Sequence, residues 1–313
     1  MSSGKEIKAR IKSVTNTKKI TRAMELISTV KMKKSQEWVL ASRPFALATL
    51  KIFAKIGESL REISAIAGHT GPETKREILV VISSNKWLCG GYNVNTFKKV
   101  AQYRKDHPDV TIDYISVGKK AREFILRTGG NLLADFSDAM KDNIEIKDIR
   151  PIASTLRSLF NPKEKEMIDQ LENVILYDRV NIVYSYYVSA INQKSVIKQF
   201  LPLNRGDITD FLESIVGQDI STIPVAEESY KIEPNGDTLV NEVIPMVLDM
   251  LVYEIFLEAK ASEHSARMVA MKNAKDSAIK KVDTLTLSYN KARQAGITKE
   301  VSEIVSGVES MKE

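Results

Sequence analysis

The chain has 313 residues, with 46 Lys and Arg against 40 Asp and Glu, and a formal net charge of +6. It contains no run of eighteen apolar residues, which makes a transmembrane helix unexpected, and its single cysteine, Cys89, excludes an internal disulfide or a cysteine-rich metal site. We therefore expect a soluble protein of about two domains in a reducing compartment. The basic N-terminus is not followed by an apolar core of the kind that a targeting peptide has.

The first predicted element is a long helix over residues 3–67, in which Gly4, Pro44 and Gly57 are the only helix breakers. Its apolar residues recur at steps of three and four, as they do along the buried seam of a long helix. The predicted seam consists of Ile7, Ile11, Val14, Ile20, Met24, Ile27, Phe45, Ala48, Ile52, Ile56, Leu60 and Ile63. Because proline removes a helix hydrogen bond, we expect a bend around Ser42 to Pro44.

The charge of the chain is concentrated at this end. The first 51 residues hold twelve Lys or Arg against three Glu, a net of +9, which leaves −3 for the remainder. Basic residues on both flanks of an apolar seam favour an acidic protein partner over a merely solvated face. Nucleic acid is the other candidate, but Trp38 is the only aromatic residue before Phe45 and no nucleic-acid-binding module is recognisable.

The middle of the chain has the pattern of an α/β domain. Apolar, β-branched runs predict strands over residues 77–84, 111–117, 132–136, 179–188 and 196–201, and helical spacing predicts helices over residues 94–105, 119–127 and 146–160. Strands that alternate with helices indicate a mostly parallel, doubly wound sheet. The last two strands have no helix between them and are expected to pair as a hairpin.

The last predicted element is a second long helix over residues 246–311, a stretch without proline whose only glycines are Gly296 and Gly307. Its seam consists of Ile255, Ala259, Ala266, Val269, Ala278, Val282, Leu285, Tyr289 and Ala292. A helix of roughly 100 Å cannot bury such a seam against a small core and needs a partner helix or a surrounding protein. We expect the two terminal helices to pair antiparallel, with domains over residues 1–68, 76–215 and 237–313.

Sequence signals for chemistry are absent. Gly90-Gly91 lies between a strand and a helix, where a phosphate loop would be, but neither G-x-G-x-x-G nor G-x-x-x-x-G-K-[ST] occurs, which favours a tight strand-to-helix turn. The three histidines are far apart and lack metal-ligand spacing. We predict no catalytic site, no metal and no cofactor, as in a mechanical or interaction subunit.

Four segments carry a resemblance to the gamma subunit of F-type ATP synthases. They are residues 5–24 (KEIKARIKSVTNTKKITRAM), 88–93 (LCGGYN), 261–274 (ASEHSARMVAMKNA) and, most closely, 289–307 (YNKARQAGITKEVSEIVSG). The segments follow the family's order and lie at both ends of the chain, so the resemblance covers the whole protein.

The resemblance implies an antiparallel coiled coil of the terminal helices and a central Rossmann-like α/β domain. It implies a central-stalk rotor that couples rotation of a membrane c ring to ATP synthesis or hydrolysis on a ring of alpha and beta subunits. The epsilon subunit is the other implied partner, and no nucleic acid, small-molecule substrate or direct membrane insertion is implied. The expected location is peripheral, at the cytoplasmic face of a bacterial cell membrane.

Site residues follow only from the resemblance. The implied contacts with the alpha–beta ring are Lys18, Lys19, Arg22, Met24, Arg293, Gln294, Thr298 and Glu300. The implied contacts with epsilon and the c ring include Tyr230 and Glu233.

Three features depart from the family pattern: Trp87 where a glycine is usual, an apparent insertion over residues 161–173, and a polar tail over residues 309–313. The first two lie in the domain where coupling partners bind. They leave open a related rotary ATPase shaft that is coupled to something other than proton transport. A coiled-coil scaffold or nucleic-acid binder is the alternative from another class, and it leaves both terminal motifs unexplained.

Overall fold

The computed structural model describes residues 4–56, 75–160, 177–202 and 236–311. The chain divides into two compact units, one made of Met1–Thr29 with Arg267–Glu313 and the other of Val30–Ala266. Two long helices, α1 (Gly4–Ile56) and α7 (Gly236–Ser310), each contribute to both units. Helix α1 continues through Pro44, and α7 begins before the proline-free stretch of residues 246–311 and continues through Pro245.

The first unit is an antiparallel pair of helical segments. The Nζ of Lys275 lies 2.8 Å from Oε2 of Glu25, and further along, a Cβ on Gly4 would lie 3.8 Å from the ring of Tyr289. Residue numbers therefore fall on α1 as they rise on α7. The α1 side of the contact follows seven-residue spacing, and the positions with this spacing, all buried or partly buried, are Gly4, Ile7, Ile11, Val14, Lys18, Thr21, Glu25 and Ser28.

The predicted seam of α1 is wrong at Ile20, Ile27, Phe45 and Ala48, which are exposed, and its last residues, Leu60 and Ile63, lie outside the described residues. Ile20 and Ile27 are 60% and 54% exposed, whereas Thr21 and Ser28, one position further along, are buried. The seven-residue spacing that begins at Ile7 places Thr21 and Ser28 on the buried side of the helix. A seam chosen from apolar residues alone misses these two positions, because their side chains are polar. The predicted seam of α7 is confirmed, since every residue from Ala278 to Ala292 that was assigned to it is buried or partly buried.

The second unit contains a five-stranded sheet in the order β3-β2-β1-β4-β5. The strands are β1 (Arg76–Ile82), β2 (Thr111–Val117), β3 (Asn131–Asp135), β4 (Arg179–Tyr187) and β5 (Gln193–Leu201). The pairs β1–β2, β1–β4 and β2–β3 are parallel, and β4–β5 is the expected antiparallel hairpin. The sheet is thus mixed and doubly wound, as the sequence predicts.

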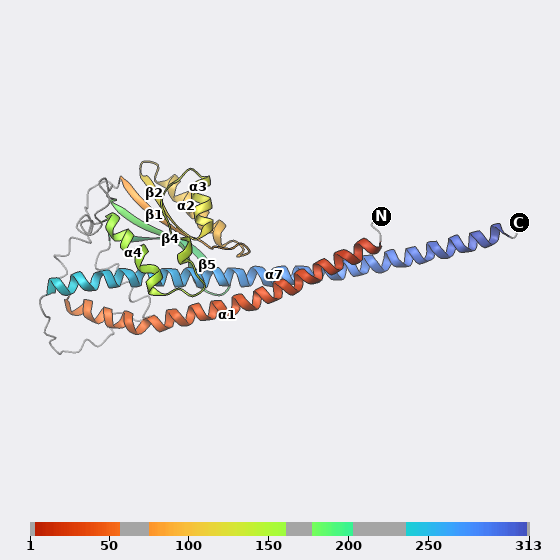
Figure 1. Cartoon of the computed structure of the whole chain (residues 1–313), viewed down its shortest axis with the longest axis horizontal. Coiled ribbons are helices and arrows are strands. Elements are labelled where there is room, and N and C mark those ends of the chain that lie inside the picture. The colour runs from red at the N-terminus through yellow and green to blue at the C-terminus, as the bar shows by residue number, and fades with distance from the viewer. Residues whose placement is uncertain (1–3, 57–74, 161–176, 203–235, 312–313) are drawn as a thin grey trace. The chain divides into compact units, whose positions relative to one another are not determined.

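Helices cover both faces of this sheet (Figure 1). On one face, α2 (Tyr92–Asp106) and α3 (Lys119–Arg127) pack Val100, Ala121 and Ile125 against the strands. On the other face lie α4 (Ile146–Phe160) and the α7 residues from Val247 to Ala259. A single-turn 3-10 helix, η2 (Ser137–Ala139), follows β3 at the edge of the sheet where the parallel strands end.

Candidate partner-binding surfaces

The outward face of α1 in the first unit combines apolar and basic side chains. Ile20, Leu26 and Ile27 are exposed large apolar residues in a segment that also carries Lys19 and Arg22 at its surface. Among the other residues expected to contact the ring here, Lys18 and Met24 are partly buried against the helix pair. Apolar side chains exposed among cations form a surface suited to a partner with both apolar and acidic groups.

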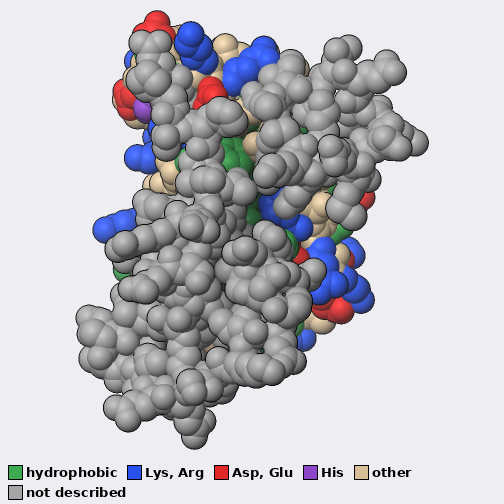
Figure 2. Space-filling view, turned by 90° about the vertical axis from the view of Figure 1, so that its left-hand side faces the viewer, with side chains coloured by type: hydrophobic (Ala, Val, Ile, Leu, Met, Phe, Trp, Pro, Cys, Tyr) green, Lys and Arg blue, Asp and Glu red, His purple; other side chains and the backbone are tan. Residues whose placement is uncertain are grey.

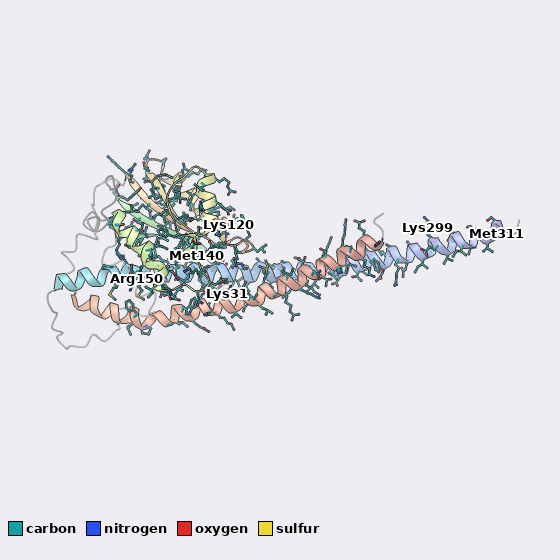
Figure 3. All side chains as sticks on the ribbon, in the orientation of Figure 1. Lys31, Lys120, Met140, Arg150, Lys299 and Met311 are labelled. Atoms are coloured by element: carbon teal, nitrogen blue, oxygen red, sulfur yellow. The ribbon has the colours of Figure 1, made fainter. Side chains whose placement is uncertain are left out.

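The end of α7 has the same character over a longer stretch. All residues from Arg293 to Met311 are exposed, although α7 remains helical to Ser310. Figure 3 labels Lys299 and Met311 in this stretch, which no other described segment accompanies. Between Arg293 and Ser310 its large exposed apolar residues are Ile297, Val301, Ile304, Val305 and Val308.

These apolar residues form one stripe along the helix, because steps of three and four residues return to the same side at about 100° per residue. On the same geometry Gln294 lies within the stripe, Arg293 and Glu300 lie along one flank, and Thr298 lies along the other. The four residues that the family resemblance selected are therefore placed around one face. The signal for the stripe was in the sequence, as apolar spacing that continues past Ala292.

The turn after β1 presents a third surface, in the second unit. Trp87 is 65% exposed, and the Nζ of Lys120 lies 3.9 Å from the centroid of its ring. Leu88, which is also exposed, has a φ of 67°, a backbone conformation uncommon for a leucine. The aromatic residue that departs from the family pattern thus stands at the surface beside a cation.

Buried side chains beneath this turn hold its shape. Asn93 Nδ2 donates to Ser84 Oγ at 2.8 Å and to Cys89 Sγ at 3.3 Å, and Ser84 Oγ donates to the Lys86 carbonyl at 2.7 Å. Gly90 follows in the left-handed region with a φ of 58°. Gly90-Gly91 is therefore part of a tight strand-to-helix turn, as the sequence predicts.

Asn85 ties this turn to two other loops, a role that the sequence does not signal. Its Nδ2 donates to the carbonyls of Ser137 and Met140, at 3.0 Å and 3.1 Å, and its Oδ1 accepts from the amide of Lys119 at 2.8 Å. All three partners lie where parallel strands end, more than thirty residues along the chain. Tyr230 and Glu233, the expected epsilon and c-ring contacts, lie outside the described residues.

The comparisons with known proteins cover the whole chain. A family model described as ATP synthase matches residues 3–311. The ATP synthase gamma chain of Opitutus terrae is 36% identical over 311 residues, which are 98% of each chain. That of Herpetosiphon aurantiacus is 34% identical over 319 residues and covers 100% of both.

This chain belongs to the ATP synthase gamma chain family. Solved structures show the same fold for it. The Euglena gracilis mitochondrial ATP synthase, in a structure of its OSCP, F1 and c-ring, contains a chain that matches with a TM-score of 0.60 at 20% identity, over 99% of this chain and 95% of that one. The central stalk and c-ring structure from Tetrahymena thermophila gives a TM-score of 0.53 over 82% of this gamma chain.

Among the described residues, no helix combines the length and the apolar character needed to cross a membrane. Within the same residues, no three His, Cys, Asp or Glu side chains gather as a metal site would require.

Proposed function

We propose that this gamma chain is the rotor of the central stalk, which couples rotation of a membrane c ring to ATP synthesis or hydrolysis on an alpha–beta ring. The observation that carries the proposal is the exposed end of α7. Residues 293–310 keep a helical backbone and an apolar stripe that no other described segment covers. An apolar stripe of this length indicates an enclosing partner, because a single helix gains little stability from its own propensity.

The proposed division of the chain follows from this role. Residues 1–68 and 237–313 form the shaft, and residues 76–215 form the domain that meets the coupling partners. The proposed ring contacts are Lys18, Lys19, Arg22, Met24, Arg293, Gln294, Thr298 and Glu300, and those for epsilon and the c ring are Tyr230 and Glu233. The gamma chain has no catalytic site of its own in this proposal, and ATP chemistry belongs to the ring.

The proposed location is peripheral, at the cytoplasmic face of a bacterial membrane, with no nucleic-acid partner. Among the described residues in Figure 2, blue Lys and Arg side chains lie near red Asp and Glu side chains.

The test uses the stripe itself. A triple variant, Ile297→Gln, Val301→Gln and Ile304→Gln, removes apolar surface from the stripe. Glutamine has a good helix propensity, so the helix itself should be kept. Because the three side chains are exposed in the free chain, we expect its unfolding free energy to change by about 0.5 kcal/mol or less. We expect capture of the chain by purified alpha and beta subunits, and their joint ATP turnover, to fall at least about tenfold.

A matched control replaces two exposed apolar residues of the second unit, in the variant Leu126→Gln with Ile191→Gln. It should leave capture and turnover unchanged. Capture of the triple variant at the level of the unaltered chain would contradict the proposal.

A further inference from the structure

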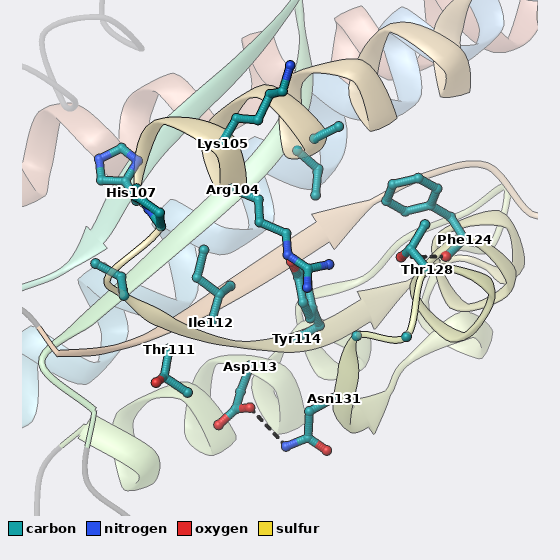
Figure 4. Close-up of a pocket in the computed structure, with 16 residues that line it drawn as sticks. Arg104, Lys105, His107, Thr111, Ile112, Asp113, Tyr114, Phe124, Thr128 and Asn131 are labelled. Carbon is teal, nitrogen blue, oxygen red and sulfur yellow. Dashed lines mark hydrogen bonds between the residues drawn. The ribbon is translucent and has the colours of Figure 1, made fainter.

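A groove of about 700 Å³ lies in the second unit, between the last turns of α2 and the end of α3 (Figure 4). Val100 of α2, Ile112 and Tyr114 of β2 and Phe124 of α3 supply its apolar surface. The ring of Phe124 stacks on that of Phe97 with 4.4 Å between centroids and 2° between planes, which fixes this wall. The volume is that of a small-molecule site, and apolar walls are typical of one.

Cations stand along the α2 side of the groove. Arg104 and Lys105 both line it, and neither forms an ion pair with any described residue. Figure 4 shows Arg104 extending from α2 towards Tyr114, while Lys105 points away from that residue. An arginine with an unengaged guanidinium fork beside an apolar floor is suited to hold a carboxylate or phosphate.

Tyr114 contributes a polar group to the lining of the groove. The residue is only 4% exposed, and its hydroxyl has no hydrogen-bond partner among the described residues. Burial raises the pKa of Tyr114, and the positive charge of Arg104 partly opposes this. The Tyr114 hydroxyl keeps some accessible surface, so it is available to donate a hydrogen bond to a ligand oxygen.

The position of the Tyr114 ring depends on Gly130 after α3. A Cβ at Gly130 would lie 2.9 Å from Cδ2 and Cε2 of that ring, a distance that real contacts do not reach. The one carboxylate in the lining is already engaged. Asp113 accepts from Asn131 Nδ2 at 2.8 Å and from the Tyr177 hydroxyl at 2.7 Å, and it lies on the side of Asn131 in Figure 4.

We propose that this groove binds a small amphiphilic anion, a flat apolar ring system bearing one carboxylate or phosphate, with the oxyanion held by Arg104 and the Tyr114 hydroxyl. The apolar ring system lies over Ile112 and against Phe124. Such a molecule is a ligand and undergoes no reaction here, since the groove contains no arrangement of groups for bond making. The inference does not depend on the rotor function, because every residue it uses lies in the second unit and outside the proposed ring contacts.

The test titrates the full chain with 2-naphthoate, followed by its fluorescence anisotropy, with 2-naphthyl phosphate and uncharged 2-naphthol in parallel. We expect saturable binding of both anions at submillimolar concentration and at least tenfold weaker binding of 2-naphthol. Arg104→Ala should weaken binding of both anions at least tenfold and leave binding of 2-naphthol unchanged. Tyr114→Phe, which removes only the hydroxyl and keeps the ring, should weaken binding of the two anions severalfold.

Arg127→Ala is the matched control, because Arg127 is an exposed arginine in the last turn of α3 that does not line the groove. It should bind like the unaltered chain. The proposal is overturned if no anion saturates the chain, if 2-naphthol binds as tightly as 2-naphthoate, or if Arg104→Ala and Arg127→Ala have equal effects. The melting temperature of each variant, measured in the same buffer, separates loss of binding from loss of folding.

Discussion

At Arg293, a substitution can change the shape of the side chain while its charge is kept. It is exposed on a flank of the apolar stripe, and its fork can hold a carboxylate or backbone carbonyls in a fixed geometry that lysine cannot reproduce. We expect Arg293→Lys to assemble with the alpha–beta ring but to change ATP turnover per complex at least about threefold. Met24→Lys, which adds a charge at a second proposed ring contact, should do the same.

The matched control for this pair is Lys299→Arg. Lys299 lies on the other side of the helix, where its Nζ is 3.6 Å from Oε1 of Glu303. If these residues only pack or solvate the coiled coil, turnover per assembled complex will not change while thermal stability does. Unchanged turnover in both variants would refute the contact.

Glu258 makes the stability of the second unit depend on pH. Burial raises the pKa of this carboxyl group to about 7, and the Glu254 carboxylate adds to the shift, while the Tyr184 hydroxyl and Lys198 oppose it. Because the folded pKa lies above the unfolded one, the stabilisation is complete below about pH 4.5 and is lost as the pH rises through about 7. The unfolding free energy should therefore fall, on the order of 1–3 kcal/mol, between pH 5 and pH 8.

Denaturant unfolding at several pH values checks this. Glu258→Gln should flatten the dependence, because the amide cannot ionise. Glu309→Gln, at an exposed position of α7, should retain it. Equal slopes for Glu258→Gln and the unaltered chain would show that another group titrates.

At the scale of the element, the seam of α1 gives a prediction opposite to the one that hydrophobicity alone would give. Ser28 is 2% exposed and Ile27 is 54% exposed. Ser28→Leu should destabilise the chain by about 1–3 kcal/mol, because a larger side chain must displace its neighbours. Ile27→Ser should change stability by about 0.5 kcal/mol or less. Thermal unfolding of both variants decides the point, and a larger loss for Ile27→Ser would mean that the heptad assignment is wrong.

The segment over residues 161–173 is a second element with a testable role, although it lies outside the described residues. It is polar and separate from the proposed shaft, so we expect its deletion to leave assembly with the alpha–beta ring intact. Pull-down of the deletion variant by alpha and beta subunits measures this. Failure of capture, with the variant still folded by circular dichroism, would show that the segment is not peripheral.

Elements with strong local signals were predictable from the sequence. Residue for residue, β2, α3 and α4 begin and end where apolar spacing and the breakers Gly129-Gly130 place them. Pairings between distant residues were not predictable. Glu77 stands at the polar margin of a predicted strand, yet it is fully buried because Arg179 Nη1, 2.9 Å from its Oε1, and the Tyr103 hydroxyl neutralise and bind it.

The candidate surfaces divide in the same way. The family resemblance over residues 289–307 selected Arg293, Gln294 and their neighbours as contacts. The period of the helix then places these residues around one apolar stripe. The groove between α2 and α3 had no sequence signal, because its arginine, tyrosine and phenylalanine come from three elements and none belongs to a motif.

For the whole molecule, we expect that the purified chain alone neither hydrolyses ATP nor binds it with micromolar affinity, because no phosphate loop is present. Phosphate release by the chain should equal the buffer background and should appear when alpha and beta subunits are added. Turnover that persists in a preparation free of both subunits would require a catalytic site that neither its motifs nor the proposed function provides.

Helix α7 belongs to both compact units and runs without a break from Gly236 to Ser310, a contour of about 112 Å at 1.5 Å per residue. Torque applied at one end would pass along the main-chain hydrogen bonds of a single helix, which lacks one such bond at Pro245 but contains no loop. In the first unit, α1 accompanies α7 up to Ala292. Beyond Ala292, the described part of α7 is a single helix of about 27 Å, which resists twisting less than two paired helices do. For a given torque, we therefore expect residues 293–310 of the free chain to twist more per residue than the paired part of α7.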